Sequence, residues 1–265
     1  MKPETVSLLC RPGTHEPLRL TSVTGPDGRT LERLVGAHSG EQFEIRDGIP
    51  RLLEESTVSG FNRRYQRLYN RVAGLYDGAM RLTANLIGGG EASFRGEYLK
   101  ELEPAEGSRV LEVSIGTGAN LRYLPAKAAF FGLDISWGML RRCQRNLRMW
   151  QRDAELILGN AEELPLRDEI FDVVFHVGGI NAFNDRAKAI SEMIRVARRG
   201  TKIVIVDETA KSMASFTWIP GFRKWMLGFG DRFSPPTGLI PKDMDEIRVR
   251  EFAGGNMYCL TFRKP

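Results

Sequence analysis

Cysteine is scarce in this chain, and two kinds of apolar segment are missing from it. The 265 residues include three cysteines, Cys10, Cys143 and Cys259, which are far apart and odd in number. This excludes a disulfide scaffold and predicts a protein of the reducing cytoplasm. No apolar run approaches the roughly 20 residues that span a bilayer. Residues 1–10 have one lysine and no apolar core, so no secretory signal is expected there.

A strong excess of charge of one sign is also missing. The net charge is +5, and it is concentrated in residues 61–100, with 7 basic and 3 acidic groups, and in residues 211–265, with 9 and 5. No run of like charge is long enough to predict a nucleic-acid-binding tail. With 42% hydrophobic and 27% charged residues, the composition is that of a folded globular protein and excludes a disordered or fibrous chain.

The hydrophobic pattern divides the chain into a small unit and a large one. Residues 1–58 contain short alternating segments separated by turn residues, which predict a small β-rich accessory domain. From about Phe61, apolar residues recur at spacings of three and four, which predicts a helix. Residues 88–90 interrupt the pattern, and a second helix is expected to end near Leu102. We therefore predict domains at residues 1–58 and 59–265.

Strands and helices alternate after Gly107. We predict strands at 109–114, 129–133, 155–158, 171–176 and 202–207, and helices near 118–124, 137–151 and 185–198. This alternation implies parallel β-α-β units with right-handed crossovers. Two more strands, at 247–252 and 257–263, would form a hairpin. The predicted fold class is α/β, with a Rossmann-like mixed seven-stranded sheet that is mostly parallel, has one antiparallel strand and carries helices on both faces.

A glycine-containing turn follows the first predicted strand. Gly116 and Gly118 would let a ligand approach the backbone closely, and the helix after them would offer free amide donors. Leu121 occupies the position of the third glycine of the dinucleotide fingerprint, which counts against NAD or FAD. Glu112, just before the turn, would repel a pyrophosphate and suits a ligand that carries a cationic amino group.

Polar residues end the next two strands. Asp134 comes 22 residues after Glu112, and a carboxylate at this place can bind both hydroxyls of a ribose. Asn160, followed by the small Ala161, can form hydrogen bonds with an adenine edge. A ribose, an adenine and a cationic amino-acid tail together describe S-adenosylmethionine.

These stretches resemble the class I S-adenosylmethionine-dependent methyltransferases, in particular those similar to the ubiquinone/menaquinone-biosynthesis methyltransferases. The matching stretches, in the expected order, are Val110 to Gly118, Phe131 to Met139, Gly159 to Leu166, Phe171 to Asn184 and Val204 to Glu208. The resemblance covers about residues 61–208. Residues 69–77 resemble the helix that precedes this fold. One departure is Ser114, where the family usually has its first glycine.

The resemblance implies roles for residues in these stretches. It assigns the methionine ammonium group to Glu112, the ribose to Asp134, and the adenine to Asn160 and Met139. The full predicted cofactor-binding set is Tyr76, Glu112, Ser114, Gly116, Gly118, Asp134, Ile135, Met139, Asn160, Ala161, Glu162 and Val177.

Two residues are candidates for acid–base chemistry. His176 and Asp207 end the fourth and fifth strands, and in this fold the end of the fourth strand faces the transferred methyl group. A histidine has the right pKa for a general base near neutral pH. A base is not obligatory, because alignment of an acceptor with an activated methyl group can supply much of the barrier reduction.

The segment at about 209–242 is irregular and rich in aromatic residues. The resemblance places such an insertion over the acceptor pocket, so we predict a substrate lid that includes Trp218, Phe222 and Trp225. Large apolar groups beside basic ones indicate a lipophilic or amphipathic acceptor. They would also suit peripheral contact with the inner membrane surface. A helix that completes the core remains the alternative.

Residues 1–58 resemble a degenerate zinc-ribbon-like domain. The zinc-bearing members hold the metal with two cysteine pairs, whereas this chain offers Cys10 together with His15 and His38. Tetrahedral zinc needs four ligands. We therefore predict that the protein holds no metal.

The sequence predicts a cytoplasmic enzyme that moves a methyl group from S-adenosylmethionine to a small lipophilic or amphipathic acceptor. Two alternatives remain. One is an rRNA or tRNA base methyltransferase that grips RNA with residues 1–58, although this unit is net acidic, with 7 basic and 9 acidic groups. The other is a non-catalytic S-adenosylmethionine-binding partner subunit. The oligomeric state is not specified by any of these patterns.

Overall fold

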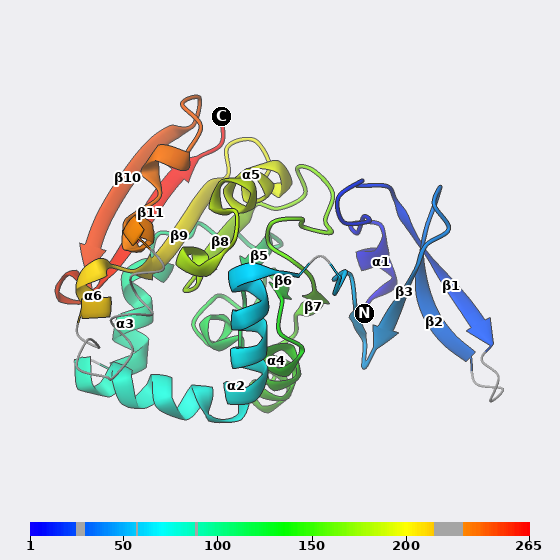
Figure 1. Ribbon diagram of the computed structural model, residues 1–265, viewed down its shortest axis with the longest axis horizontal. Helices are drawn as coiled ribbons and strands as arrows, with labels where there is room; N and C mark the ends of the chain where they lie inside the picture. Colours follow the sequence, from blue (N-terminus) through cyan, green and yellow to red (C-terminus); the bar gives the residue numbers. More distant parts are fainter. Residues whose placement is uncertain (25–29, 57, 88–89, 215–229) are drawn as a thin grey trace.

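Two β-sheets organise the molecule. The computed structural model describes residues 1–24, 30–56, 58–87, 90–214 and 230–265. A seven-stranded sheet forms the centre of the large unit, and a four-stranded sheet stands beside it (Figure 1).

The large sheet has the strand order β10-β11-β9-β8-β5-β6-β7. Neighbouring strands from β9 to β7 are parallel, and β11 runs antiparallel to both β9 and β10. The predicted fold class, with one antiparallel strand, is therefore confirmed. The strands are β5 Arg109–Val113, β6 Ala129–Asp134, β7 Glu155–Leu158, β8 Val173–Val177, β9 Lys202–Glu208, β10 Asp245–Phe252 and β11 Met257–Arg263.

Helices cover both faces of this sheet. The helices α3 Gly90–Leu99 and α4 Trp137–Trp150 pack on one face, and α5 Arg186–Val196 packs on the other. The central strands are runs of Val, Ile, Leu and Phe because both of their faces are buried. Side chains cap two of the helices: Ser136 accepts a hydrogen bond from the Met139 amide, and Asp185 accepts one from the Lys188 amide.

The helix α2, Gly60–Ile87, precedes the sheet and packs against α4 and α3 (Figure 1). Short helical segments complete the described chain. These are α6 Ala210–Ala214 and the 3-10 turns Ala119–Arg122, Ile180–Ala182, Gly230–Phe233, Thr237–Leu239 and Ala253–Gly255.

The structure corrects the predicted helix at 118–124. A single 3-10 turn, Ala119–Arg122, stands there. Gly118 begins it in the left-handed conformation, with φ 76°. Pro125 follows three residues after its end, and the residue before a proline is disfavoured in the α conformation. Too few residues remain between these two breakers for an α-helix.

Other predicted bounds shift by a few residues. The fourth strand begins at Val173 rather than at 171, and the helix α3 ends at Leu99 rather than near Leu102. The strand predicted at 155–158 has the bounds that the structure shows. The interruption predicted at residues 88–90 lies mostly outside the described residues.

The described residues before α2 form the smaller unit, and the domain boundary at residues 58 and 59 stays a prediction. The smaller unit contains α1 Pro3–Val6 and four antiparallel strands in the order β1-β2-β3-β4, with bounds Leu18–Thr24, Thr30–Gly36, Gln42–Arg46 and Ile49–Pro50. Its buried Leu9, Leu18, Leu34 and Leu52 belong to the same apolar core as strands of the large sheet. The unit therefore shares a core with its neighbour.

The smaller unit covers the β7 edge of the large sheet. The Leu52 amide donates to the Leu158 carbonyl at 2.9 Å. The Cys10 amide donates to the Pro165 carbonyl at 3.1 Å, just after that edge. An exposed strand edge invites unwanted pairing, so this contact protects β7 and ties residues 1–58 to the loop that follows it.

Candidate functional site

The turn after β5 is shaped by three left-handed residues. Ser114, Gly116 and Gly118 have φ values of 61°, 57° and 76°. A Cβ added at Gly118 would lie 2.6 Å from the Cys143 sulfur, so this glycine lets the turn pack on α4. A Cβ added at Gly116 would meet nothing within 4 Å. Gly116 therefore borders open space at the carboxyl end of the sheet.

Glu112 is buried beside this turn. Its Oε1 accepts a hydrogen bond of 2.6 Å from Asn120, whereas its Oε2 has no hydrogen-bond partner among the described residues. Burial raises the pKa of Glu112 to about 8. Buried carboxylate oxygens are rarely left unpaired, so Oε2 is a ready acceptor for a hydrogen-bond donor or a cation.

The sequence did not reveal the side chains that hold Glu112 in place. The Asn120 side-chain oxygen accepts hydrogen bonds from Arg95 at 2.6 Å and from the Tyr98 hydroxyl at 2.7 Å. Arg95 also pairs with Glu91 at 2.9 Å. The one signal available was Asn120 itself, two residues after Gly118, because Arg95 and Tyr98 come from α3.

Asp134 ends β6 next to the glycine turn. Its Oδ2 accepts a hydrogen bond from the Gly116 amide and its Oδ1 one from the Ser136 amide, both at 2.8 Å. Burial raises the pKa of Asp134 to about 6. The sheet register sets Glu112 beside Gly132, two residues before Asp134 on the same strand. The structure thus gathers Glu112, Gly116 and Asp134 at the carboxyl end of β5 and β6.

The helix α2 fixes the segment that follows Asp134. The Asn70 side-chain oxygen accepts hydrogen bonds from the Ser136 hydroxyl at 2.7 Å and the Gly138 amide at 2.8 Å. Gln66 donates to the Ile135 carbonyl at 3.2 Å. Ile135 is half-buried, and these contacts hold its backbone at the start of α4. The side chain of the predicted Tyr76, farther along α2, lies outside the described residues.

The loop after β7 carries the residues predicted to meet adenine. Asn160 is half-buried, and its side-chain oxygen accepts from the Glu162 amide at 3.1 Å, which stabilises the turn. Glu162 is buried and accepts hydrogen bonds from Asn62 at 2.8 Å and from the Asp185 amide at 3.2 Å. Ala161 is buried between them. The Glu162 carboxylate therefore links this loop to α2 and α5.

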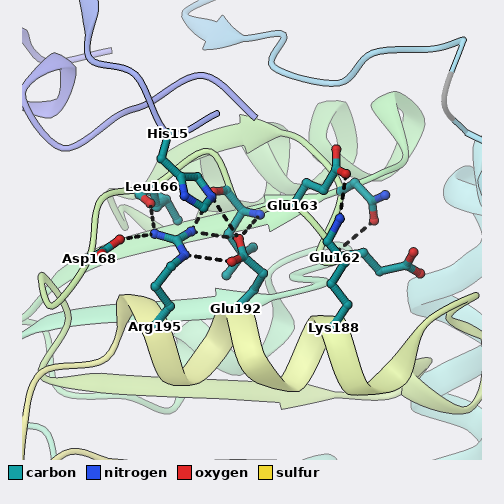
Figure 2. Close-up of polar contacts among 10 residues, drawn as sticks. His15, Glu162, Glu163, Leu166, Asp168, Lys188, Glu192 and Arg195 are labelled. Carbon is teal, nitrogen blue, oxygen red and sulfur yellow. Dashed lines mark hydrogen bonds and ion pairs between the residues drawn. The ribbon is translucent and has the colours of Figure 1, made fainter. Parts of the chain in front are cut away.

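A charged cluster clamps the same loop to α5 (Figure 2). The Glu192 carboxylate accepts from the Leu164 amide at 2.7 Å and from Arg195 at 2.7 Å. Arg195 in turn donates to the Leu164 and Leu166 carbonyls at 3.0 and 2.7 Å. His15, from the smaller unit, lies 3.8 Å from Glu192. The helix α5 and the smaller unit, which are distant in sequence, thus both contact the charged cluster that holds residues 160–166.

His176 lies on the other side of the site, at the end of β8. It is fully buried, and its Nδ1 is 2.9 Å from the Val113 carbonyl. Because a carbonyl accepts hydrogen bonds only, Nδ1 carries the proton and Nε2 keeps a free lone pair. Nε2 has no partner among the described residues. Burial lowers the pKa of His176, which favours this neutral form.

Asp207 serves the loop that follows β8. Its Oδ2 accepts hydrogen bonds from the Gly179 amide at 3.2 Å and the Asn181 amide at 2.9 Å. The carboxylate thus has partners and holds residues 179–181 in place. Of the other predicted site residues, Met139 is buried in α4, and Val177 is half-buried at the end of β8.

The predicted lid residues Trp218, Phe222 and Trp225 lie outside the described residues. Within the described ranges, no three His, Cys, Asp or Glu side chains are grouped so as to hold a metal ion. Burial raises the pKa of the Cys10 thiol to about 12, which disfavours the thiolate that a metal would need. In the same part of the chain, no helix has both the length and the apolar composition required to cross a membrane.

Known proteins resemble this chain in sequence and in fold. Residues 111–205 match the sequence model of the family described as "Methyltransferase domain". The demethylmenaquinone methyltransferase of Streptomyces avermitilis is 30% identical over 64% of this chain and 68% of its own length. The phosphatidylethanolamine N-methyltransferase of Cereibacter sphaeroides is 36% identical over 40% of this chain and 54% of its own length.

The fold is also found among solved structures. A possible histamine N-methyltransferase from Thermotoga maritima superposes with a TM-score of 0.58 and 19% identity, over 76% of this chain and 99% of that protein. This likeness concerns the fold. The chain spans between 45% and 64% of the length of three of the curated relatives that it matches.

Proposed function

This chain belongs to the class I S-adenosylmethionine-dependent methyltransferase family, and from that premise we propose that it transfers a methyl group to a small lipophilic or amphipathic acceptor. S-adenosylmethionine is the methyl donor of the family. When bound, it supplies a methyl group that the positive sulfonium already activates. The chain's own residues would bind this donor, orient it and position the acceptor.

The observation that carries the proposal is the unpartnered oxygen of Glu112. Its Oε2 is buried and available for a charged hydrogen bond from the ammonium group of the donor. Gly116 borders open space next to it, where a side chain would fill the cradle. The Asp134 oxygens accept amide hydrogen bonds from Gly116 and Ser136 and retain capacity for a ribose hydroxyl. These residues therefore fit the donor.

The remaining cofactor contacts are part of the same proposal. Ser114 and Gly118 shape the turn, and Tyr76, whose side chain lies outside the described residues, stays a predicted contact. The adenine and the methionine tail would be enclosed by the loop of Asn160, Ala161 and Glu162. The further members of the proposed cofactor site are Ile135, Met139 and Val177. The clamp of Glu192 and Arg195 supports this proposal, because it holds the loop without help from a ligand.

The acceptor class rests on the relatives. The two relatives described above are named for demethylmenaquinone and for phosphatidylethanolamine, both of them lipophilic acceptors. We extend this class to the present chain and place the acceptor beside His176, Asp207 and the aromatic insertion. Peripheral contact with an anionic membrane surface would deliver such an acceptor. Residues 1–58 act in this proposal as a metal-free accessory domain that braces the loop after β7.

Binding and transfer can be measured separately. Calorimetry should show that the purified chain binds S-adenosylmethionine and S-adenosylhomocysteine. Labelled S-adenosylmethionine, incubated with the protein and fractionated lipid, small-metabolite and RNA extracts, should then label a lipid or small-metabolite fraction. Label in RNA alone would identify a base methyltransferase instead. Binding without transfer to any fraction would identify a non-catalytic subunit, and absence of binding would refute the proposal.

A further inference from the structure

Three buried polar atoms lack hydrogen-bond partners around Asp207. They are Nε2 of His176, Oδ1 of Asn181 and the hydroxyl of Tyr258, and none of them has a partner among the described residues. The exposed fractions of the three side chains are 0%, 3% and 0%. Buried polar atoms almost always have partners. Three exceptions around one carboxylate leave hydrogen-bonding capacity that a ligand could use in this part of the site.

The fold brings these groups together from distant parts of the chain. The antiparallel register of β11 and β9 sets Tyr258 directly opposite Asp207. The parallel register of β8 and β9 sets His176 beside Ile205, whose side chain points to the same face as Asp207 two residues later. The backbone amide of Asn181 donates to Asp207 at 2.9 Å. Asp207 is therefore the positioning residue at the centre of the group.

The free atoms have a defined hydrogen-bonding character. His176 already donates through Nδ1 to the Val113 carbonyl, so its Nε2 can only accept. Asn181 already donates through Nδ2 to the Glu208 carbonyl at 3.0 Å, and its free Oδ1 is an acceptor too. The Tyr258 hydroxyl can donate. Two acceptors and one donor complement a ligand group that both gives and takes hydrogen bonds.

An apolar cluster adjoins these polar atoms. Ala182, next to Asn181, packs with Phe233, and Phe61 and Tyr65 from α2 and Met213 from α6 lie against them. An apolar wall next to three polar atoms fits a molecule with an apolar body and a single polar head.

We propose that the acceptor binds with a protic head group, a hydroxyl or an amine, against His176, Asn181 and Tyr258, and that Nε2 of His176 takes the proton of this group. The acceptor oxygen or nitrogen forms its new bond to the methyl carbon while the carbon–sulfur bond of the donor breaks. The electron pair of that bond stays on sulfur, and the acceptor proton leaves on the imidazole, which becomes an imidazolium. Tyr258 and Asn181 orient the head group.

This inference rests on the proposed methyl transfer, and a binding experiment tests it apart from catalysis. The probes are 4-hexylphenol and hexylamine, with 4-hexylanisole as a matched molecule that has no hydrogen to donate. Calorimetry is performed in the presence of S-adenosylhomocysteine. The phenol or the amine should bind the wild-type chain at least tenfold more tightly than the anisole, because the anisole has no hydrogen to donate to either buried acceptor.

Two variants examine the contributions of single atoms. Tyr258→Phe should weaken binding of the preferred probe about fivefold and raise its KM. His176→Asn can keep the hydrogen bond to Val113 while it removes Nε2, so it should lower kcat at least a hundredfold, as loss of a general base does. Both variants should bind S-adenosylhomocysteine within twofold of wild type. Tyr123→Phe, at the residue that ends the 3-10 turn Ala119–Arg122, is the control and should change neither probe binding nor kcat.

The outcomes separate this inference from the proposed function. If the wild-type chain binds S-adenosylhomocysteine but prefers neither protic probe to the anisole, the inference is wrong and the methyltransferase proposal stands. Unchanged probe binding in Tyr258→Phe would also overturn it, and this variant removes no hydrogen bond from the fold. If the chain binds neither the cofactor nor any probe, both proposals fail together.

Discussion

The two halves of the candidate site satisfy their polar groups in different ways. In the cofactor half, Asp134 accepts hydrogen bonds from two backbone amides, and Asn120 connects Glu112 to α3. In the acceptor half, the free atoms of His176 and Tyr258 have no partner in the described chain. In our proposal, the cofactor half is therefore largely assembled before the donor binds, and Glu112 Oε2 is its one buried unpartnered side-chain atom among the described residues. The proposed acceptor half has three such atoms, on His176, Asn181 and Tyr258.

The strongest test of the assembled half is removal of Asp134. Asp134→Ala should weaken S-adenosylhomocysteine binding by about 2–3 kcal/mol, because hydrogen bonds to a charged group are lost. Calorimetry of the variant and the wild type measures the difference. Asp172→Ala is a matched control, because Asp172 also accepts a backbone amide hydrogen bond at 2.8 Å, from Arg109 at the opposite end of the sheet. Equal losses in both variants would mean that Asp134 acts through stability alone.

The cofactor half and the acceptor half also differ in how well they could be predicted from the sequence. The strands of the large sheet were predicted to within a few residues, and Glu112 and Asp134 were singled out, because a strand, its turn and its terminal carboxylate are contiguous in the chain. Arg95 and Tyr258 were not identified, since they reach the site from α3 and β11 through tertiary packing. The spacing of residues within one segment of the sequence does not show which distant segments pack against it. The residues of the proposed acceptor half were therefore less well predicted than those of the cofactor half.

The pH dependence of binding gives the next effect in size. Folding raises the pKa of Glu112 from 4.5 to about 8, so its stabilising contribution is full below pH 4.5 and is lost as the pH rises through about 8. The ammonium group of S-adenosylhomocysteine requires the ionised carboxylate. The affinity of the chain for S-adenosylhomocysteine should therefore fall by up to about tenfold for each pH unit below 8.

A ligand without the amino-acid tail isolates this effect. Methylthioadenosine lacks the ammonium group but keeps the ribose, so its affinity should stay level from pH 8 to about 6. It should decline only below the pKa of Asp134, which burial raises to about 6. Calorimetry of both ligands across this range separates the two carboxylates. Parallel pH profiles would contradict the assignment of the ammonium group to Glu112.

Substitution of one buried tyrosine in each half compares the two halves by the change in the free energy of unfolding. Tyr98 donates to Asn120 at 2.7 Å on the cofactor side, so Tyr98→Phe should lower the free energy of unfolding by about 1 kcal/mol. The Tyr258 hydroxyl has no described partner, so Tyr258→Phe should change the stability of the ligand-free protein by less than about 0.5 kcal/mol. Urea denaturation at constant m-value measures both. A large loss in Tyr258→Phe would reveal a partner and weaken the contrast.

Ser114 gives the smallest expected effect, at the boundary between the two halves. Its φ of 61° costs an L-residue about 1–2 kcal/mol, and glycine removes this strain while it adds about 0.5–1 kcal/mol of unfolded-state entropy. Ser114→Gly should therefore stabilise the protein by about 0.5 kcal/mol, which thermal or urea denaturation can measure. Gln151→Gly, at φ 53° after α4, should give a similar gain far from the turn. If Ser114→Gly alone also weakens S-adenosylhomocysteine binding more than twofold, the serine hydroxyl contacts the cofactor, and the strain is retained for binding rather than for the fold.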